Sequence, residues 1–189
     1  MDVSNFSLGK FKEENPKMRE KILLDILDSL ELKPLGPRET GAAVLSLELL
    51  KDFGEIVKTD RDGKVRQVAL VGLVYGLCER PVHDGQAPED KSLVSCLIHA
   101  AIKDEDELIR TGAQQDVFPA LFVFRPDLAY DMYVEAESLR KGGDSEAVRA
   151  NALKAREAIF TSLSDAVDGP SVPRSLRQIC ILRSCVAAT

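Results

Sequence analysis

The stretch Asp60-Arg61-Asp62-Gly63-Lys64-Val65-Arg66 decides the fold of this chain, because it returns 44 residues later as Asp104-Glu105-Asp106-Glu107-Leu108-Ile109-Arg110. In both copies, acidic residues stand six and four positions before an arginine that follows an apolar residue. An acidic residue just ahead of an apolar-periodic run is typical of a helix N-terminus, where its carboxylate accepts backbone N–H bonds and suits the helix dipole. Each stretch therefore predicts a turn that opens a helix, with the arginine in or near the first turn.

Two weaker copies of the same phrase extend the pattern. In the first copy Glu13 stands where the acidic residue should be, and in the last copy Asp144 lies one residue too close to the arginine. An arginine near the positive end of a helix dipole needs a carboxylate partner, and we expect an aspartate of the same turn or of the neighbouring repeat to supply it. An internal period of this length indicates a repeat array. The four arginines, at intervals of 47, 44 and 39 residues, are Arg19, Arg66, Arg110 and Arg149.

This pattern resembles the HEAT repeat, a helix–turn–helix unit whose second helix starts with Asp, four variable residues and then Val-Arg. The stretches that begin at Asp60 and Asp104 match that spacing, the second with Ile in place of Val. The proline that many such repeats carry in the preceding helix is not found at a regular place. The resemblance covers roughly residues 10–165. It implies an all-α fold, a right-handed stack of about four antiparallel helix pairs in a HEAT- or armadillo-like superhelix.

Breaks in the pattern divide the chain into an N-terminal arm or partial helix at 1–13, a helical repeat domain at 14–168 and a C-terminal helix or docking tail at 169–189. Thr40 is a possible cap for a helix before the first quoted stretch. The segment from Val65 to Cys78 is apolar almost all round, including Val71, which predicts a central helix that is covered on more than one side. A buried parallel strand is the alternative for that segment.

Three residues bear on helix packing and helix ends. Gly72 and Gly76 permit a close approach of another helix to the central helix, at some cost in helix propensity. Pro119 must kink or shorten the helix that opens near Asp106.

Composition sets broad limits on function. The net charge of −6 argues against a nucleic-acid or anionic-membrane surface, and the lack of Trp with 5% aromatic residues argues against a carbohydrate site or a base-stacking groove. Cys78 and Cys96 fall within helical apolar runs, while Cys180 and Cys185 fit neither a CxxC motif nor a zinc-ligand pair. We therefore expect the cytoplasm or another reducing compartment, no membrane span and no secretory signal, with a cleaved organellar transit peptide still open.

Motifs of catalysis and of ligand binding are missing from the sequence. His83 stands beside Asp84 in a Pro-rich loop, and His99 lies on an apolar helix, so neither has partners at metal-ligand spacing. The glycine-rich phosphate loops, the dinucleotide fingerprint, the nucleophile elbow and the EF-hand spacing are all absent. The sequence thus predicts no catalytic, cofactor-binding or metal-ligating residue, and it favours a protein without catalytic activity over an enzyme.

The function that follows is a non-catalytic protein–protein interaction scaffold, or a subunit of a larger assembly, with protein partners and no cofactor. In arrays that look like HEAT repeats the second helices line the concave side, which makes residues after each arginine candidates for partner binding: Gln67, Thr111, Gln115 and Lys154. Two alternatives stay open. One is a nucleic-acid-processing or other enzyme on a helical repeat scaffold, which needs a basic, aromatic-bearing groove. The other is a plain helical bundle with no true repeat.

Overall fold

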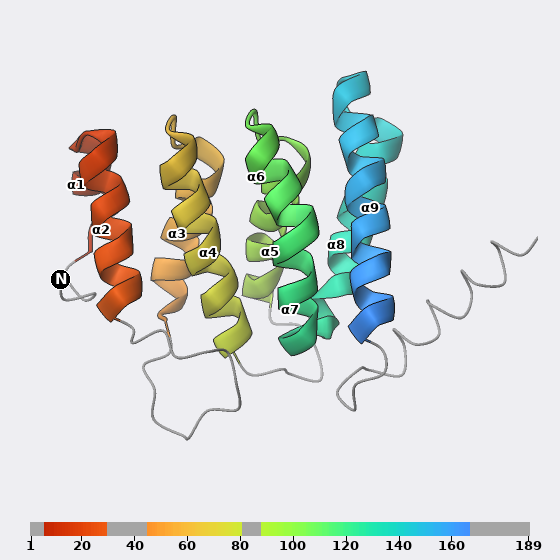
Figure 1. The fold of residues 1–189 in the computed structure, drawn as a ribbon, viewed down its shortest axis with the longest axis horizontal. Coiled ribbons are helices and arrows are strands. Elements are labelled where there is room, and N and C mark those ends of the chain that lie inside the picture. The colour runs from red at the N-terminus through yellow and green to blue at the C-terminus, as the bar shows by residue number, and fades with distance from the viewer. Residues whose placement is uncertain (1–5, 30–44, 81–87, 167–189) are drawn as a thin grey trace, which may run out of the picture. The chain divides into compact units, whose positions relative to one another are not determined.

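The computed structural model describes residues 6–29, 45–80 and 88–166, and every regular element in these ranges is a helix (Figure 1). The prediction of an all-α protein is therefore confirmed, and the segment at 65–78 is helical, not a strand. The chain divides into two compact units, residues 1–81 and 82–189. The proposed cap Thr40, His83, the cysteines at 180 and 185 and the tail at 169–189 lie outside the described residues.

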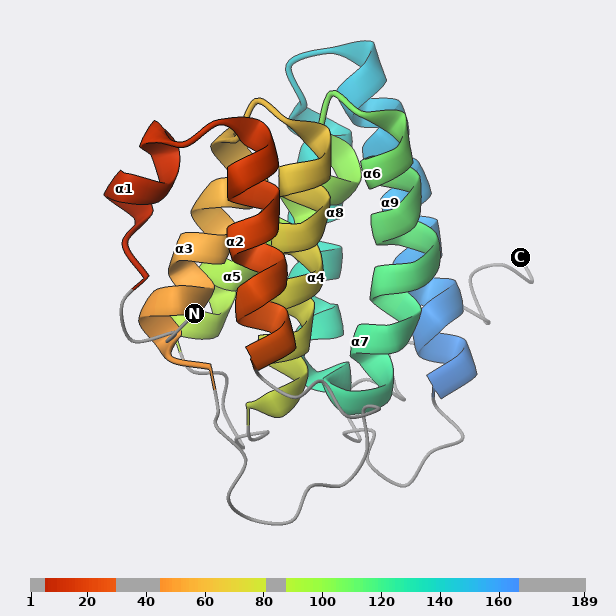
Figure 2. The same cartoon turned by 60° about the vertical axis from the view of Figure 1, so that its left-hand side comes forward.

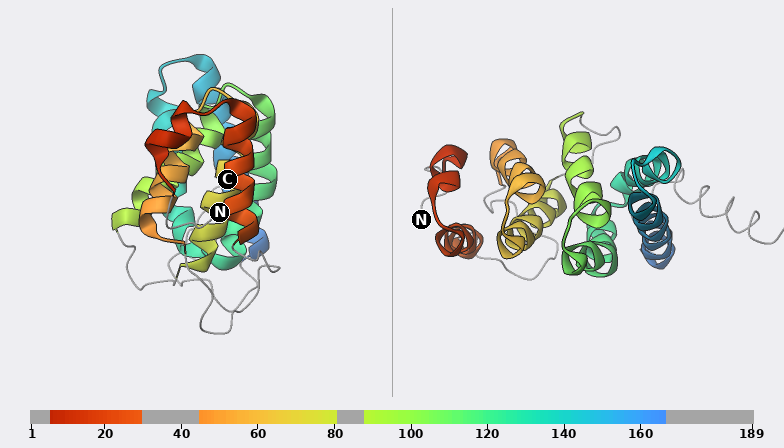
Figure 3. Two further views of the ribbon diagram at one scale, coloured as in Figure 1. Left: turned by 90° about the vertical axis from the view of Figure 1, so that its left-hand side faces the viewer. Right: turned by 90° about the horizontal axis from the view of Figure 1, so that it is seen from above.

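The described part of the first unit contains two helix pairs, which the view from above in Figure 3 shows end-on. The second helix of the first pair opens with a proline at its first position, where the missing N–H has no intrahelical partner to lose. The second pair starts after Ser46, whose hydroxyl accepts the Leu49 N–H at 3.2 Å. The elements are α1 (Leu8–Glu13), α2 (Pro16–Ser29), α3 (Leu47–Thr59) and α4 (Gly63–Glu79).

Helix α4 packs against both α3 and α2 in this unit (Figure 2). A Cβ atom added to Gly72 would lie 2.7 Å from the ring of Phe53, and one added to Gly76 would overlap Leu50, both of α3. The two glycines therefore let the backbone of α4 approach the side chains of α3, as the sequence predicted. Helix α4 is thus covered on more than one side, as predicted, although Val71 on this helix is 48% exposed.

The first described helix of the second unit is α5 (Pro88–Ile102). It contacts α6 in the next segment of the chain and both helices of the last pair, α8 and α9. A second segment consists of α6 (Glu107–Gly112), the π-helical turn η2 (Ala113–Val117) and α7 (Phe118–Phe124). The 3-10 turn η3 (Pro126–Leu128) leads into α8 (Ala129–Gly142), which pairs with α9 (Glu146–Ala166) across a short turn (Figure 1). None of the helices in the described part of the chain is both long and apolar enough to cross a lipid bilayer.

Pro119 interrupts the helix that opens after Asp106, as predicted, and the interruption takes the form of a π turn. Proline lacks the N–H of the α-helical ladder, and its ring clashes with the carbonyl four residues earlier, here that of Gln115. The widened turn at 113–117 ends two residues before the proline and contains that carbonyl. Gln114 in this turn donates from its side chain to the Ala101 carbonyl at 2.7 Å, which ties the turn to the end of α5.

Candidate functional site

Four turns among the described residues share one construction. Each has a capping side chain that accepts a backbone N–H of the next helix: Met18 N–H at 3.1 Å, Val65 N–H at 3.2 Å, Leu108 N–H at 2.8 Å and Val148 N–H at 3.2 Å. The arginine of each repeat phrase lies four residues after the cap and donates its own N–H to the carbonyl of the capping residue at 3.0 to 3.1 Å. The caps are Asn15, Asp62, Asp106 and Ser145.

The guanidinium group of each arginine also has a common partner, a main-chain carbonyl just before the cap. Arg66 donates to the carbonyl of Asp60 at 2.8 Å, and Arg110 donates to that of Asp104 at 2.6 Å. Arg149 donates to the carbonyl of Gly143 at 2.8 Å. In these three turns the acceptor stands two residues before the cap. In the first turn Arg19 donates at 2.6 Å to the main-chain carbonyl of Glu14, one residue before the cap.

Asp60 and Asp104 hold the turns in shape from the same position. The Oδ1 atom of each accepts the N–H of the capping residue two positions later, at 2.9 Å for Asp60 and 2.8 Å for Asp104. This is the side-chain-to-backbone bond that aspartate readily forms in turns. The two aspartates of each quoted stretch therefore have different roles: the first stabilises the turn, and the second caps the helix.

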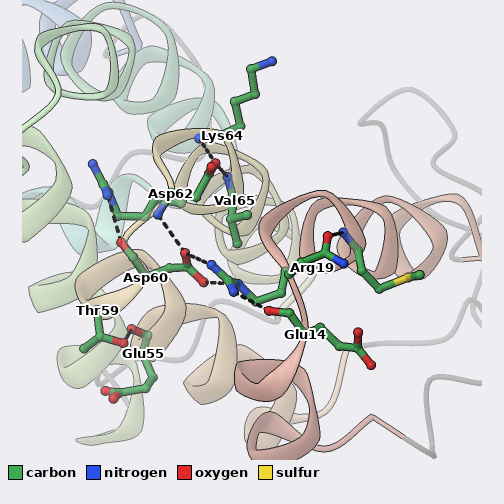
Figure 4. Close-up of polar contacts among 11 residues, drawn as sticks. Glu14, Arg19, Glu55, Thr59, Asp60, Asp62, Lys64 and Val65 are labelled. Atoms are coloured by element: carbon green, nitrogen blue, oxygen red, sulfur yellow. Dashed lines mark hydrogen bonds and ion pairs between the residues drawn. The ribbon is translucent and has the colours of Figure 1, made fainter.

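Asp60 also joins one helix pair to the next inside the first unit (Figure 4). The Nε and Nη2 atoms of Arg19 donate to the two carboxylate oxygens of Asp60, both at 2.9 Å. The two side chains are only 12% and 6% exposed, so water screens the pair weakly. The carboxylate of the neighbouring turn is thus the partner that the sequence led us to expect for this arginine.

The corresponding junction of the second unit is made differently, because Gly143 occupies the position that aspartate holds in the two quoted stretches. The guanidinium of Arg110 there donates to the main-chain carbonyls of Asp104 and Glu105. Asn151 on α9 instead donates from its side chain to the Ile102 carbonyl at the end of α5, at 3.1 Å. In this second junction the Ser95 hydroxyl on α5 also donates to the Glu135 carboxylate on α8 at 2.9 Å, so side-chain hydrogen bonds join the two helix pairs.

The two weaker copies of the phrase are capped by residues other than aspartate. Near Glu13 and Asp144, which depart from the pattern, the residues that bind the helix N-termini are Asn15 and Ser145. Asparagine and serine cap helices as well as aspartate does. Counting from these caps, the arginine falls at the same position in all four turns.

The candidate partner-binding residues lie on the second helices, and their exposure differs. Gln67, Gln115 and Lys154 are exposed, while Thr111 is half-buried. The position nine residues after the cap is exposed in all four helices. Its occupants are Leu24, Val71, Gln115 and Lys154. The first two were not among the candidates from the sequence, where Val71 was counted with the apolar residues of the central helix.

A buried ion pair in the second unit gave no signal in the sequence. Arg125 is 1% exposed at the break between α7 and η3, and its guanidinium donates to both oxygens of Asp127 at 2.9 and 2.8 Å. The Arg125 N–H also donates to the Leu121 carbonyl at 2.7 Å. A buried charge needs such partners, so this arginine fixes the corner between the two helices.

Glu137 on α8 accepts hydrogen bonds from three cations. Arg140 donates to both of its oxygens at 2.8 and 2.7 Å, Lys141 lies at 3.2 Å, and Arg156 donates from α9 at 3.2 Å. These bonds, chiefly those from Arg140, lower the pKa of Glu137 from 4.5 to about 2. The same pairing raises the pKa of Arg140. The cluster holds α8 to α9 through the Arg156 contact.

The exposed face of α3 is acidic. Burial, together with the charges of Glu48 and Glu55, raises the pKa of Asp52, and the opposing charge of Lys12 is too weak to reverse this shift. Lys12 on α1 forms an ion pair with Glu55 at 3.4 Å. Glu48 and Glu55 are exposed, and Asp52 is half-buried on the same helix.

Little in the described residues points to catalysis. No group of three or more His, Cys, Asp or Glu side chains suited to a metal ion occurs within residues 6–29, 45–80 and 88–166. His99 is half-buried on α5. No protein-family model, curated protein sequence or solved structure matches this chain.

Proposed function

We propose that this protein is a non-catalytic interaction scaffold, a HEAT-like stack of helix pairs that binds a protein partner through the surface of its second helices. The observation that carries the proposal is the common construction of the four turns. In each, a cap binds the helix N-terminus, and an arginine four residues later binds a main-chain carbonyl of the turn. Four turns that share such detail favour a true repeat over a plain bundle.

Packing inside each unit supports the same proposal. In the second unit the first helices α5 and α8 contact each other, as do the second-helix elements α7 and α9, although α5 also contacts α9. In the first unit α2 contacts α4, and the Lys12–Glu55 ion pair joins α1 to α3. Like positions stacked on like positions are typical of solenoids, in which each repeat contacts its neighbours and leaves a continuous surface for binding.

The two buried arginines of the described residues have partners within the fold. Arg66 and Arg125, 5% and 1% exposed, donate to the turn at Asp60 and to the carboxylate of Asp127. A catalytic site needs reactive groups gathered in a cleft with room for substrate. The exposed position nine residues after each cap carries instead an amide, aliphatic or lysine side chain, which is suited to contact and not to chemistry.

Photo-crosslinking tests this function directly. A benzophenone amino acid is placed singly at Gln67, Gln115 and Lys154 on the second helices, and as controls at Lys51 on α3 and Ser138 on α8, all of them exposed positions. We expect a defined protein to crosslink from the second-helix positions in cell lysate, with little product from the controls. Equal crosslinking from both sets, or none from the second helices, would contradict the proposal.

A further inference from the structure

The second helices of the first unit carry the same residue types at the same positions. Lys17 and Lys64 stand two residues after the caps of α2 and α4, and Leu24 and Val71 stand nine residues after them. Seven residues are close to two helical turns, so the lysine and the aliphatic residue of each helix lie on one side, roughly 10 Å apart. Because α2 and α4 pack together, the two sides adjoin.

The surface so formed is called the α2–α4 face. It comprises the lysines and the aliphatic residues together with the side chains that lie between them in the helical rows: Lys17, Lys21, Leu24, Lys64, Gln67 and Val71.

This face is open and its charges are not used within the described structure. Leu24 and Val71 are 43% and 48% exposed, and the three lysines and Gln67 are exposed as well. Among residues 6–29, 45–80 and 88–166, none of these lysines forms an ion pair. Three positive charges thus lie on the turn side of two exposed aliphatic side chains, on a protein whose net charge is −6.

The combination is specific to the first unit. Two residues after the cap, the second unit has Leu108 and Ala147 in place of lysine, and nine residues after it has Gln115 and Lys154 in place of aliphatic residues. A helix start therefore does not require the lysine, and the exposed position does not require an aliphatic residue. The stability of the turns therefore does not explain why lysine and aliphatic residues recur at these positions in α2 and α4, whereas a role in binding does.

We propose that the α2–α4 face binds an acidic amphipathic helix of a partner protein, an inference that rests on the proposed function. A helix with apolar residues at i, i+3, i+4 and i+7 would lay them over Leu24 and Val71. Its carboxylates would lie over Lys17, Lys21 and Lys64 at the turn end of the face. Asp28, exposed one further turn along α2, excludes carboxylates from the opposite end.

Two other classes of ligand suit the face less well. A membrane surface requires a large apolar area that enters the lipid boundary, and two aliphatic side chains supply little of it. Single-stranded nucleic acid requires aromatic side chains or arginines on which bases stack, and the six residues of the face include neither. An acidic helix uses both the lysines and the aliphatic pair.

The test uses a synthetic probe and the full chain. The probe is a fluorescein-labelled peptide of about 18 residues, with leucines along one helical side and glutamates beside them. We expect its anisotropy to rise with protein concentration, and the binding to weaken as salt is added. A scrambled peptide of the same composition and a peptide with lysine in place of glutamate should bind at least about tenfold more weakly.

Matched variants locate the binding. Lys17→Glu, Lys21→Glu and Lys64→Glu together should weaken binding at least about tenfold, as three exposed charge pairs can. The control Lys10→Glu, Lys91→Glu and Lys103→Glu makes the same charge change at exposed lysines elsewhere and should have little effect.

The apolar contact is tested in the same way. Leu24→Asp with Val71→Asp should weaken binding of the probe at least about tenfold, because a carboxylate replaces each aliphatic contact and repels the glutamates. Val123→Asp with Leu153→Asp places the same change at exposed apolar residues of the second unit and should leave binding unchanged. Circular dichroism of each variant shows that it is folded.

Several outcomes would overturn the inference. The first is binding of the scrambled peptide as tight as that of the probe. The second is an equal loss of probe affinity in the face variants and the control variants. The third is that the protein does not bind the probe but binds phosphatidylserine vesicles or single-stranded DNA. Crosslinking of a partner from Gln115 and Lys154, with none from the α2–α4 face, would refute this inference alone. Absence of crosslinks from every second helix would refute the proposed function too.

Discussion

The ion pair between Arg19 and Asp60 is expected to stabilise the first unit well beyond the level of a surface pair. Exposed pairs contribute about 0.2–1 kcal/mol, whereas removal of one partner from a buried pair costs about 3–5 kcal/mol. Arg19 and Asp60 are 12% and 6% exposed and share two hydrogen bonds of 2.9 Å, which places them between these cases. We expect a coupling free energy of about 2 kcal/mol.

The perturbation is a double-mutant cycle with Arg19→Met and Asp60→Asn. Asparagine keeps an oxygen that can accept the Asp62 N–H, so the turn bond at 2.9 Å is retained while the charge is removed. Each single variant should unfold at lower urea concentration, and the double variant should lose less than the sum of the two. Urea unfolding followed by circular dichroism gives the three free-energy differences.

The pair Lys12–Glu55 is the internal control, because it also joins the two helix pairs of the first unit but is 49% and 46% exposed at 3.4 Å. Its cycle should give less than about 0.5 kcal/mol. A coupling for Arg19 and Asp60 as small as that of the control would refute the argument from burial and geometry.

Three further predictions concern packing, turns and pH. Gly72→Leu should destabilise the fold by at least about 2 kcal/mol because its Cβ meets an aromatic ring at 2.7 Å, whereas Gly142→Ala, with open space around it, should be neutral in thermal melting. Arg66→Ala and Arg110→Ala should each cost about 1–3 kcal/mol, and unchanged urea midpoints in both would remove their role in the turns. Glu137 has a folded pKa of about 2 against an ordinary 4.5, so its contribution to stability is present above about pH 4.5 and is lost as the pH falls toward 2. Urea unfolding across this range should show wild type and Glu137→Gln converge at the acid end, and a constant gap would contradict the pKa.

The sequence predicted those features that follow from local chemistry. Asp62 and Asp106 cap helices because carboxylates suit free backbone N–H groups, and Pro119 breaks a helix because it lacks the donor. Asn15 and Ser145 were missed because the pattern was defined by aspartate, although an amide or a hydroxyl accepts the same bond.

Features that depend on distant neighbours were beyond the sequence. The exposure of Val71 is set by which side of α4 other helices leave open, and hydrophobicity alone does not reveal it. Arg125 and Asp127 form a spacing too common to stand out, and only their burial at a corner gives the pair its importance. The positions Gln67 and Gln115 were chosen through the repeat resemblance, and their exposure leaves their role in binding a prediction.

The choice of a main-chain carbonyl as the acceptor for each arginine affects how freely this protein can change. Every residue type carries a main-chain carbonyl, so the position that accepts the guanidinium bond can differ in side chain. It is aspartate in two turns (Asp60, Asp104) and glycine in a third (Gly143), and the bond is present in all three. A turn of this kind is specified by little more than a capping side chain and an arginine. Lineages that keep those two features can replace the surrounding residues and acquire new binding surfaces while the underlying architecture persists.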